Sequence, residues 1–300
     1  PRGGRPGPGV QIIEPSRAKL QVYCFGGLRV TAGGHELSPR GADGYRQNKA
    51  WELLAYLAAM RPGPLSRVQV ITALWPTTNE ANGLSNLGAI ASRLRDVIEL
   101  QVSDLGSEVV CRGHDSSSRL DTKAVWSDVH QFLQLSWEGR HSSSAKAREA
   151  CERARDLYLG DLLAGTPYKW LHERGGGALT LQEEYREEFR TVTRRLGSLY
   201  CDEDRPDLAV AVYRTLLDQE PLLEDIVRRL YRCYQLLGDR VAIKREHVQL
   251  QDNLRKVYAD PDEPERVIDS DLFQPSAETM EAYAEALADL DARARSSRAG

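Results

Sequence analysis

The strongest constraint on the fold is the order of the elements predicted between residues 46 and 121. Apolar residues recur at helical spacing in three successive segments, residues 48–60, 66–75 and 84–98. Two short runs typical of β-strands follow, at residues 108–112 and 118–121. Three helices and then a hairpin is the element order of a winged helix-turn-helix, which places its third helix in the major groove of DNA. We therefore expect such a domain over residues 20–123, with a small sheet or hairpin over residues 20–34 ahead of the helices.

The third predicted helix has the clearest amphipathic pattern. Its apolar residues recur every three or four positions and predict one buried stripe, formed by Leu84, Leu87, Ala91, Leu94 and Ile98. The opposite face carries Asn82, Ser85, Asn86, Ala89, Arg93 and Asp96. Asn and Arg side chains can read adenine and guanine edges, and Ala can contact a thymine methyl group. The alternative is an ordinary solvated helix face, but the order of helices and hairpin favours a DNA-reading helix.

Composition limits the classes of protein that fit this chain. Three hundred residues suggest about two domains. No apolar run approaches the ~18 residues of a membrane span, so we expect no membrane contact. The five cysteines are odd in number and form no Cys-x-x-Cys pair, which suits a cytoplasmic protein. No catalytic or metal-ligand motif is present, and we expect neither enzymatic activity nor a cofactor.

Charge separates the two halves of the chain. Residues 20–125 carry eleven basic and ten acidic side chains, whereas the remaining carboxyl-terminal part is acidic. Because DNA binding draws much of its free energy from neutralised phosphates, nucleic acid contact is not expected in the acidic half. The near-neutral first half has little excess positive charge with which to neutralise phosphates. A dimer or a partner would supply the missing charge.

The second half reads as helical almost throughout. Helical periodicity predicts six helices, at residues 127–137, 144–159, 178–200, 206–219, 222–237 and 240–258. The tripeptide at 194–196 recurs at 228–230, an offset of 34 residues. Part of a tetratricopeptide repeat is matched by Ala209, Tyr213, Leu216, Leu217 and Pro221. We therefore expect a helical-repeat domain over residues 124–292, although an unrelated helical bundle stays open. A Pro/Gly-rich linker at 1–19, an acidic loop at 259–275, a last helix at 276–292 and a frayed tail at 293–300 complete the expected organisation.

Several motifs together resemble one family of regulators. They are Phe25-Gly-Gly-Leu-Arg-Val, Lys49-Ala-Trp-Glu-Leu-Leu-Ala-Tyr-Leu-Ala, Ala73-Leu-Trp-Pro, Ser92-Arg-Leu-Arg95, Leu157-Tyr-Leu-Gly-Asp-Leu-Leu163 and Asp218-Gln-Glu-Pro221. With them, residues 20–290 resemble the SARP-type (antibiotic regulatory protein-like) transcriptional activators of actinobacteria. In that family an OmpR-like winged helix precedes a bacterial transcriptional activator domain built of tetratricopeptide-like helices.

The resemblance implies a DNA-binding transcriptional regulator, an activator that binds promoter repeats as a homodimer in the cytoplasm, at the nucleoid. It implies base contacts from Ser85, Asn86, Ala89 and Arg93, and phosphate contacts from Ser92, Arg95, Arg112 and Arg119. It also implies that the loop between the second and third helices, residues 75–83, faces RNA polymerase through Trp75, Thr77, Thr78, Asn79 and Glu80. Arg95 lies near the buried stripe, so a packing role for its aliphatic stem is an equal alternative to phosphate contact.

A second function stays open beside this one. The third helix carries the small residues Gly88, Ala89 and Ala91, and the turn of the hairpin reads His114-Asp-Ser-Ser-Ser118, where members of the family usually carry other residues. These departures suit a protein-interaction scaffold with a degenerate winged helix that binds no specific DNA. The concave surface of the helical repeats would then hold a protein or a small ligand.

Overall fold

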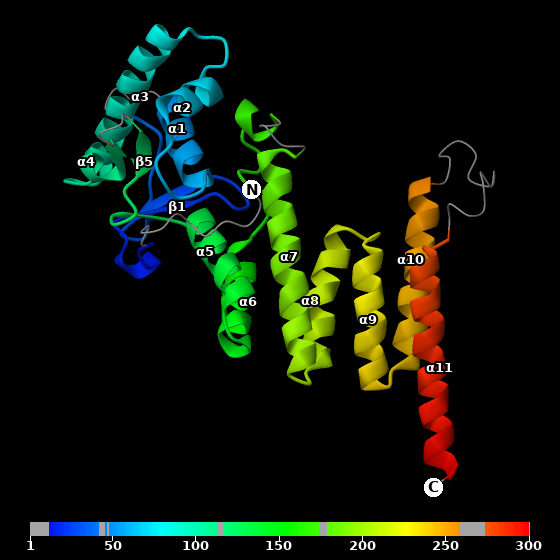
Figure 1. The fold of residues 1–300 in the computed structure, drawn as a ribbon. Coiled ribbons are helices and arrows are strands. Elements are labelled where there is room, and N and C mark those ends of the chain that lie inside the picture. Colours follow the sequence, from blue (N-terminus) through cyan, green and yellow to red (C-terminus); the bar gives the residue numbers. More distant parts are fainter. Residues whose placement is uncertain are drawn as a thin grey trace. The chain divides into compact units, whose positions relative to one another are not determined.

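The computed structural model describes residues 12–41, 46, 48–112, 117–173, 179–258 and 274–299 (Figure 1). Contacts divide the chain into two compact units, Pro1–Phe189 and Arg190–Gly300. The chain is mostly helical with a small sheet near its amino terminus, which confirms the predicted fold class. The predicted domain boundary at residues 123/124 stays a prediction.

A four-stranded sheet opens the first unit, after a short 3-10 helix, η1 (Pro15–Arg17). Its strands are β1 (Leu20–Tyr23), β2 (Arg29–Ala32), β3 (His35–Glu36) and β6 (Val125–Ser127), in the order β3-β2-β1-β6. The turn at Gly33 and Gly34, both at positive φ, joins β2 to β3. The sequence interpretation missed β6, which pairs parallel to β1 and opens a segment that was expected to be helical. Three residues are too few to show a strand's alternation.

Three helices follow the first three strands. They are α1 (Asn48–Ala59), α2 (Arg67–Leu74) and α3 (Glu80–Gln101). Ser66 caps α2, and its capping box is completed by Gln69, whose side chain accepts the Ser66 N–H at 2.9 Å. Figure 1 shows α3 beside α1 and α2. The predicted starts of α1 and α2 are thus confirmed within one residue.

The start of α3 differs from the prediction. Asn79 caps this helix by accepting the Asn82 N–H at 2.9 Å, so residues 80–83 are helical and the predicted loop of residues 75–83 ends at Asn79. The buried stripe also shifts. Leu84 is 36% exposed, and the residue that packs against α2 is Gly83. The remaining stripe residues are buried as predicted, joined by Ile90 and Val97.

A hairpin closes the predicted winged helix. It is formed by β4 (Val110–Arg112) and β5 (Ser118–Leu120), which pair antiparallel with Cys111 opposite Arg119. The predicted first strand began at Glu108, which is wrong because residues 106–109 form a single helical turn, α4 (Gly106–Val109). Most of the predicted turn, residues 113–116, lies outside the described residues.

The rest of the first unit is a helix pair and the beginning of a long helix. Its elements are α5 (Asp128–His141), α6 (Ser144–Leu157), the 3-10 helix η2 (Lys169–Leu171) and the first part of α7 (Leu181–Asp202). α5 and α6 pack closely, since a Cβ on Gly139 would lie 2.5 Å from the Cys151 Sγ.

A buried carboxylate ties the sheet to α5. Asp128 is the first residue of α5, and its two oxygens accept the backbone N–H groups of Cys24 and Phe25 at 2.8–3.0 Å. Burial raises the pKa of Asp128 to about 7, although the hydrogen bonds from Phe25 and Cys24 oppose this shift. The carboxylate therefore connects the residues after β1 to a helix more than a hundred positions later in the chain, a contact that sequence patterns do not reveal.

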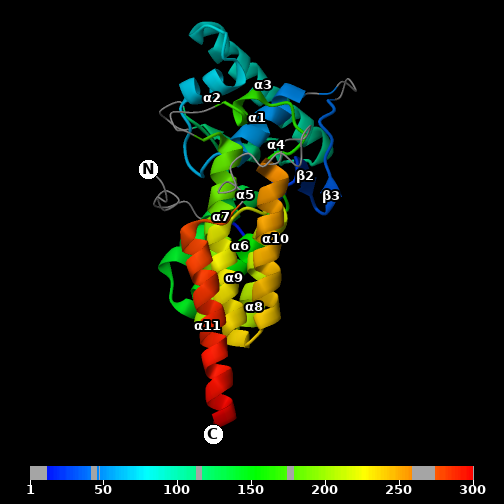
Figure 2. The ribbon, with the colours of Figure 1, turned by 90° about the vertical axis from the view of Figure 1, so that its right-hand side faces the viewer.

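The second unit consists of helices that stack in sequence order. After the end of α7 come α8 (Pro206–Gln219), α9 (Glu224–Leu237), α10 (Arg240–Tyr258) and α11 (Ala277–Ala299). Both ends of α8 and α10 are as predicted. Figure 2 shows α11 along α9 and α10, and the stacked rings of His247 and Tyr283, 3.9 Å apart, join α10 to α11. Most of the predicted acidic loop, residues 259–273, lies outside the described residues.

The packing of α7 against α8 agrees with a helical repeat. A Cβ on Gly197 would lie 2.3 Å from the ring of Tyr213, so the two helices approach as closely as a glycine allows. Of the residues predicted to form the repeat, Ala209, Tyr213 and Leu216 are buried, Leu217 is half-buried and Pro221 is exposed. α11 runs to Ala299, whereas the sequence predicted an end at Ala292 and a frayed tail over residues 293–300.

Candidate nucleic-acid interface

One face of α3 presents the side chains that were predicted to contact bases. Ser85, Asn86, Ala89 and Arg93 are all exposed, and the neighbouring Ser92 is exposed as well. These residues lie opposite the stripe that buries Leu87, Leu94 and Ile98. The structure thus brings five of the predicted DNA-binding residues together on one free helix face.

Both ends of α3 are held by close packing. At its first turn, a Cβ on Gly83 would lie 2.4 Å from the Ile71 Cγ2 of α2. At its last turn, the Glu99 carboxylate accepts the backbone N–H groups of Asp104 at 2.6 Å and Gly106 at 2.8 Å, which lowers its pKa. Gly106 also approaches the Arg95 carbonyl so closely that a Cβ there would lie 2.4 Å from it. α2 and α4 therefore fix the orientation of the exposed face.

The predicted phosphate-binding arginines fall into three different environments. Arg119 is exposed on β5. Arg95 is half-buried at the edge of α3, where its Nε donates a hydrogen bond to the Ala91 carbonyl at 3.1 Å. Arg112 belongs to β4 and pairs through its backbone with Ser118, and its side chain lies outside the described part of the chain. Arg119 is thus the hairpin arginine with a described, exposed side chain.

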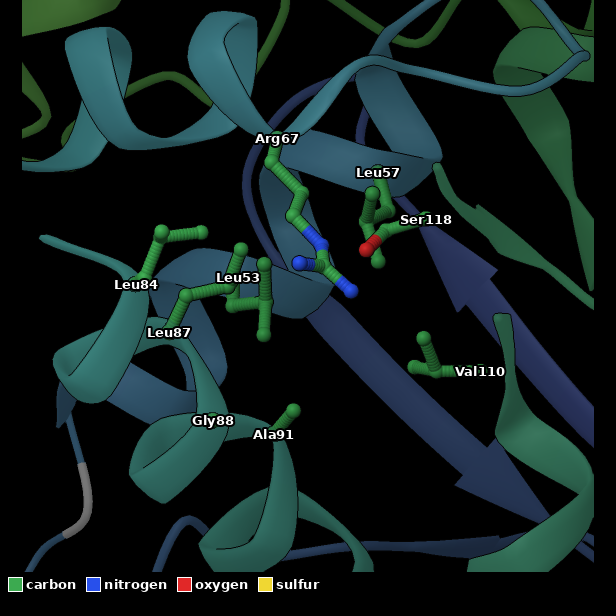
Figure 3. A pocket seen from close by; sticks show the side chains of 9 residues that line it. All are labelled: Leu53, Leu57, Arg67, Leu84, Leu87, Gly88, Ala91, Val110 and Ser118. Carbon is green, nitrogen blue, oxygen red and sulfur yellow. The ribbon is translucent and has the colours of Figure 1, made fainter. Parts of the chain in front are cut away.

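A crevice of ≈ 140 Å³ lies between α3 and the hairpin (Figure 3). It is lined by Leu53, Leu57, Arg67, Leu84, Leu87, Gly88, Ala91, Val110 and Ser118. Gly88 and Ala91 are two of the small residues that depart from the family pattern, and they face this space rather than a tightly packed neighbour. Figure 3 shows Arg67 extending into the crevice from the first turn of α2. Arg67 was not among the predicted DNA-binding residues, because its place beside α3 and the hairpin depends on the packing of α2.

The loop predicted to face RNA polymerase is shorter than expected. Thr77 and Glu80 are exposed, and Thr78 is half-buried. Asn79 serves as the cap of α3. The half-buried Trp75 lies under the Lys49 ammonium of α1, 5.3 Å from the ring centroid, and the same ammonium donates to the Leu74 carbonyl at 2.7 Å. Two of the five predicted residues therefore have structural roles.

Neither a membrane span nor a metal cluster is found in the described part of the chain. None of its helices has both the length and the hydropathy needed to cross a membrane. Within the same described ranges, His, Cys, Asp and Glu do not gather in threes that could hold a metal ion. The arrangement on α3 and the hairpin is one of hydrogen-bonding and cationic groups on a free surface, which suits contact with an extended anionic partner.

Comparisons with known proteins agree with this architecture. Residues 127–257 match the profile of the family described as "Bacterial transcriptional activator domain", which is a family of transcription regulators and not of enzymes. The solved structure of Mycobacterium tuberculosis EmbR in complex with a low affinity phosphopeptide matches 89% of this chain and 69% of that chain, with a TM-score of 0.58 and 19% sequence identity. No curated protein matches. At that identity the likeness to EmbR shows the fold. Residues 127–257 are thus similar to a bacterial transcriptional activator domain and follow a winged helix, an organisation like that of the SARP-type regulators that the sequence resembles.

Proposed function

We propose that this regulator binds promoter DNA by placing α3 in the major groove and the β4–β5 hairpin against the neighbouring backbone. The observation that carries the proposal is the exposed row of Ser85, Asn86, Ala89 and Arg93 on a helix whose opposite face buries Leu87, Leu94 and Ile98. A helix presented in this way can enter a major groove about 12 Å wide without rearrangement of its neighbours.

Two side chains would supply most of the sequence discrimination. Arg93 suits a guanine edge and Asn86 an adenine edge, and each good bidentate contact contributes about 1–3 kcal/mol against a wrong base. The Ala89 methyl group and the Ser85 hydroxyl add smaller contributions at adjacent base pairs. Phosphate contacts from Ser92, Arg95, Arg112 and Arg119 would fix the register without reading sequence.

Activation is the second part of the proposal. The connection between α2 and α3 offers Thr77 and Glu80 as exposed side chains, and Thr78 as a half-buried one. These residues lie at the amino-terminal end of α3, so a polymerase subunit bound beside the DNA could reach them. The helical repeats of residues 124–292 would then serve homodimerisation on promoter repeats, and the protein would act at the nucleoid.

A salt series tests DNA binding directly. The full chain is titrated against a labelled fragment of its own upstream region at several salt concentrations, alongside Arg93→Ala. The matched control is Arg153→Ala, which removes the same charge from the exposed surface of α6. We expect binding that weakens with salt, a loss of about tenfold or more in Arg93→Ala, and little change in the control. Equal losses in both variants would mean that only net charge matters and would remove the role of α3.

A groove in the second unit keeps the interaction scaffold as a second candidate. It has a volume of ≈ 420 Å³ and is lined by residues of α8, α9, α10 and the α8–α9 connection: Arg214, Leu217, Asp218, Pro221, Val227, Arg245, Glu246, Gln249, Leu250 and Asn253. Stacked helical repeats commonly bind partners on such surfaces. If the full chain binds no fragment at low salt while the second unit captures a partner in pull-downs, the scaffold function replaces the DNA-binding one.

A further inference from the structure

Two cysteines that are 32 positions apart in the sequence meet in the second unit. Cys201 lies near the end of α7 and Cys233 in α9, and their sulfur atoms are 3.4 Å apart. The two other cysteines with described side chains, Cys24 and Cys151, are buried in the first unit. The helical repeat thus creates a thiol pair that the spacing of cysteines along the chain does not suggest.

The two thiols of this pair differ in access. Cys201 is partly exposed, whereas Cys233 is fully buried between helices. Cys201 is therefore the more accessible of the two residues to a small oxidant. This is the arrangement of an attacking thiol backed by a second thiol that resolves the oxidised product.

The surroundings also favour the thiolate at Cys201. The hydrogen bond from the Cys233 thiol lowers the pKa of Cys201 to about 7, and the guanidinium groups of Arg232 and Arg229 act in the same direction. The pKa of Cys233 is raised by the hydrogen bond to Cys201 and by burial. Since the thiolate is the reactive form of cysteine, Cys201 is the nucleophile of the pair and Cys233 keeps its proton at neutral pH.

We propose that Cys201 and Cys233 form a reversible disulfide when a hydroperoxide reaches the protein. In the first step the Cys201 thiolate attacks the outer peroxide oxygen. The O–O bond breaks, and the leaving oxygen takes up a proton as water or an alcohol. In the second step Cys233 gives up its proton and its sulfur attacks the Cys201 sulfenic acid. The S–S bond forms as the S–O bond breaks, and hydroxide leaves with that proton as water. A dithiol reverses the change by thiol–disulfide exchange.

Little movement separates the reduced pair from the bonded one. A disulfide requires the two sulfurs to be about 2.05 Å apart, so they must approach by roughly 1.3 Å. Cys201 is one residue from Asp202, the last residue of α7, so the approach involves the end of this helix rather than its interior. The bond would join α7 to α9 across the intervening α8 and so fix the curvature of this part of the repeat.

The test uses the reduced full chain and hydrogen peroxide. After treatment, remaining thiols are alkylated, and the protein is analysed by intact mass and by peptide mapping without reduction. We expect loss of two of the five thiols, one cross-linked peptide containing Cys201 and Cys233, and full recovery with dithiothreitol. Absence of this peptide when the folded chain has consumed peroxide would overturn the proposal.

Three variants separate the roles of the two sulfurs. Cys201→Ser should lose the cross-linked peptide at the same peroxide dose, while Cys233→Ser should stop at a sulfenic acid that dimedone traps on Cys201. The control Cys151→Ser in α6 should cross-link like the wild type. Circular dichroism confirms that each variant is folded, and Cys201→Ser, at a partly exposed position, carries the test if Cys233→Ser unfolds. Equal peroxide consumption by Cys201→Ser and the wild type would contradict the assignment of the nucleophile.

Discussion

Two glycines of α3 should respond in opposite ways to the same substitution. Gly88 is half-exposed, and a Cβ added there would meet no heavy atom within 4 Å. Because glycine in a helix interior loses more backbone entropy than alanine, Gly88→Ala should raise the free energy of unfolding of the first unit by about 0.5–1 kcal/mol. The added methyl group lies in or beside the crevice between α3 and the hairpin, where there is room for it.

The same change at Gly83 should destabilise the unit. Its Cβ would lie 2.4 Å from the Ile71 Cγ2 and 3.4 Å from two further carbons of that side chain. Ile71 is only 6% exposed and β-branched, so it has few rotamers to retreat into. Overpacking costs about 1–3 kcal/mol, which exceeds the gain in helix propensity. We expect a net loss of about 0.5–2 kcal/mol, together with a shift of α3 relative to α2 that weakens DNA binding.

Tryptophan fluorescence reports on the first unit alone, because all five tryptophans lie before residue 190. Urea unfolding of the full chain followed in this way therefore isolates the unit that contains both glycines. The urea midpoint of the wild type should lie between the midpoints of the two variants. The reasoning is refuted if Gly83→Ala is as stable as the wild type, or if Gly88→Ala is less stable than it.

Three further outcomes follow from the structure. Burial raises the folded-state pKa of Asp128 to about 7, above the unfolded value near 4, so the folded protein binds this proton more tightly than the unfolded chain does. The stability that protonated Asp128 contributes is complete below pH ~4 and is lost as the pH rises through ~7. This amounts to on the order of 4 kcal/mol, and Asp128→Asn should flatten the dependence of the urea midpoint between pH 5 and pH 8. Gly197→Ala should destabilise the second unit by about 1–3 kcal/mol, seen as earlier thermal loss of helix by circular dichroism, since its Cβ would lie 2.3 Å from the Tyr213 ring; unchanged melting would contradict such close packing. Thr77→Ala combined with Glu80→Ala should leave promoter binding intact and reduce transcription in a purified system, whereas normal transcription would remove the polymerase contact from this loop.

Sequence patterns located helices best where both ends carry a local signal. Pro206 starts α8 at its first position, and Gly238 ends α9 in the left-handed conformation that glycine adopts most readily. The start of α3 was missed because its first turn, residues 80–83, contributes little to the apolar periodicity, although Asn79 is a good capping residue. β6 was missed because a three-residue strand is defined by its partner β1 rather than by its own pattern.

The sequence predicted the residues of the candidate site that share one helix, but not the contacts between elements that are distant along the chain. The exposed face of α3 follows from helical spacing, so Asn86 and Arg93 could be named from the sequence. Arg67 beside the crevice, the Asp128 contact with the residues after β1, and the Cys201–Cys233 pair all join elements that are distant along the chain. Their proximity depends on helix and strand packing, which a single sequence does not encode at any fixed spacing.

The fold also limits the electrostatic affinity that the proposed DNA binding can have. Packing and capping already use Asn79, Glu99 and the Arg95 Nε, so the predicted phosphate contacts include only three arginines per chain, with Arg93 as a fourth cation at the bases. Three neutralised phosphates correspond to a slope of log K against log salt of about −3, and six phosphates, from two copies on a promoter repeat, to about −5. A single copy with so few cations binds weakly at physiological salt, whereas two copies roughly double the electrostatic contribution. A measured slope near −5 would therefore assign the affinity to paired copies, and one near −3 would leave the helical repeats without a role in dimeric binding.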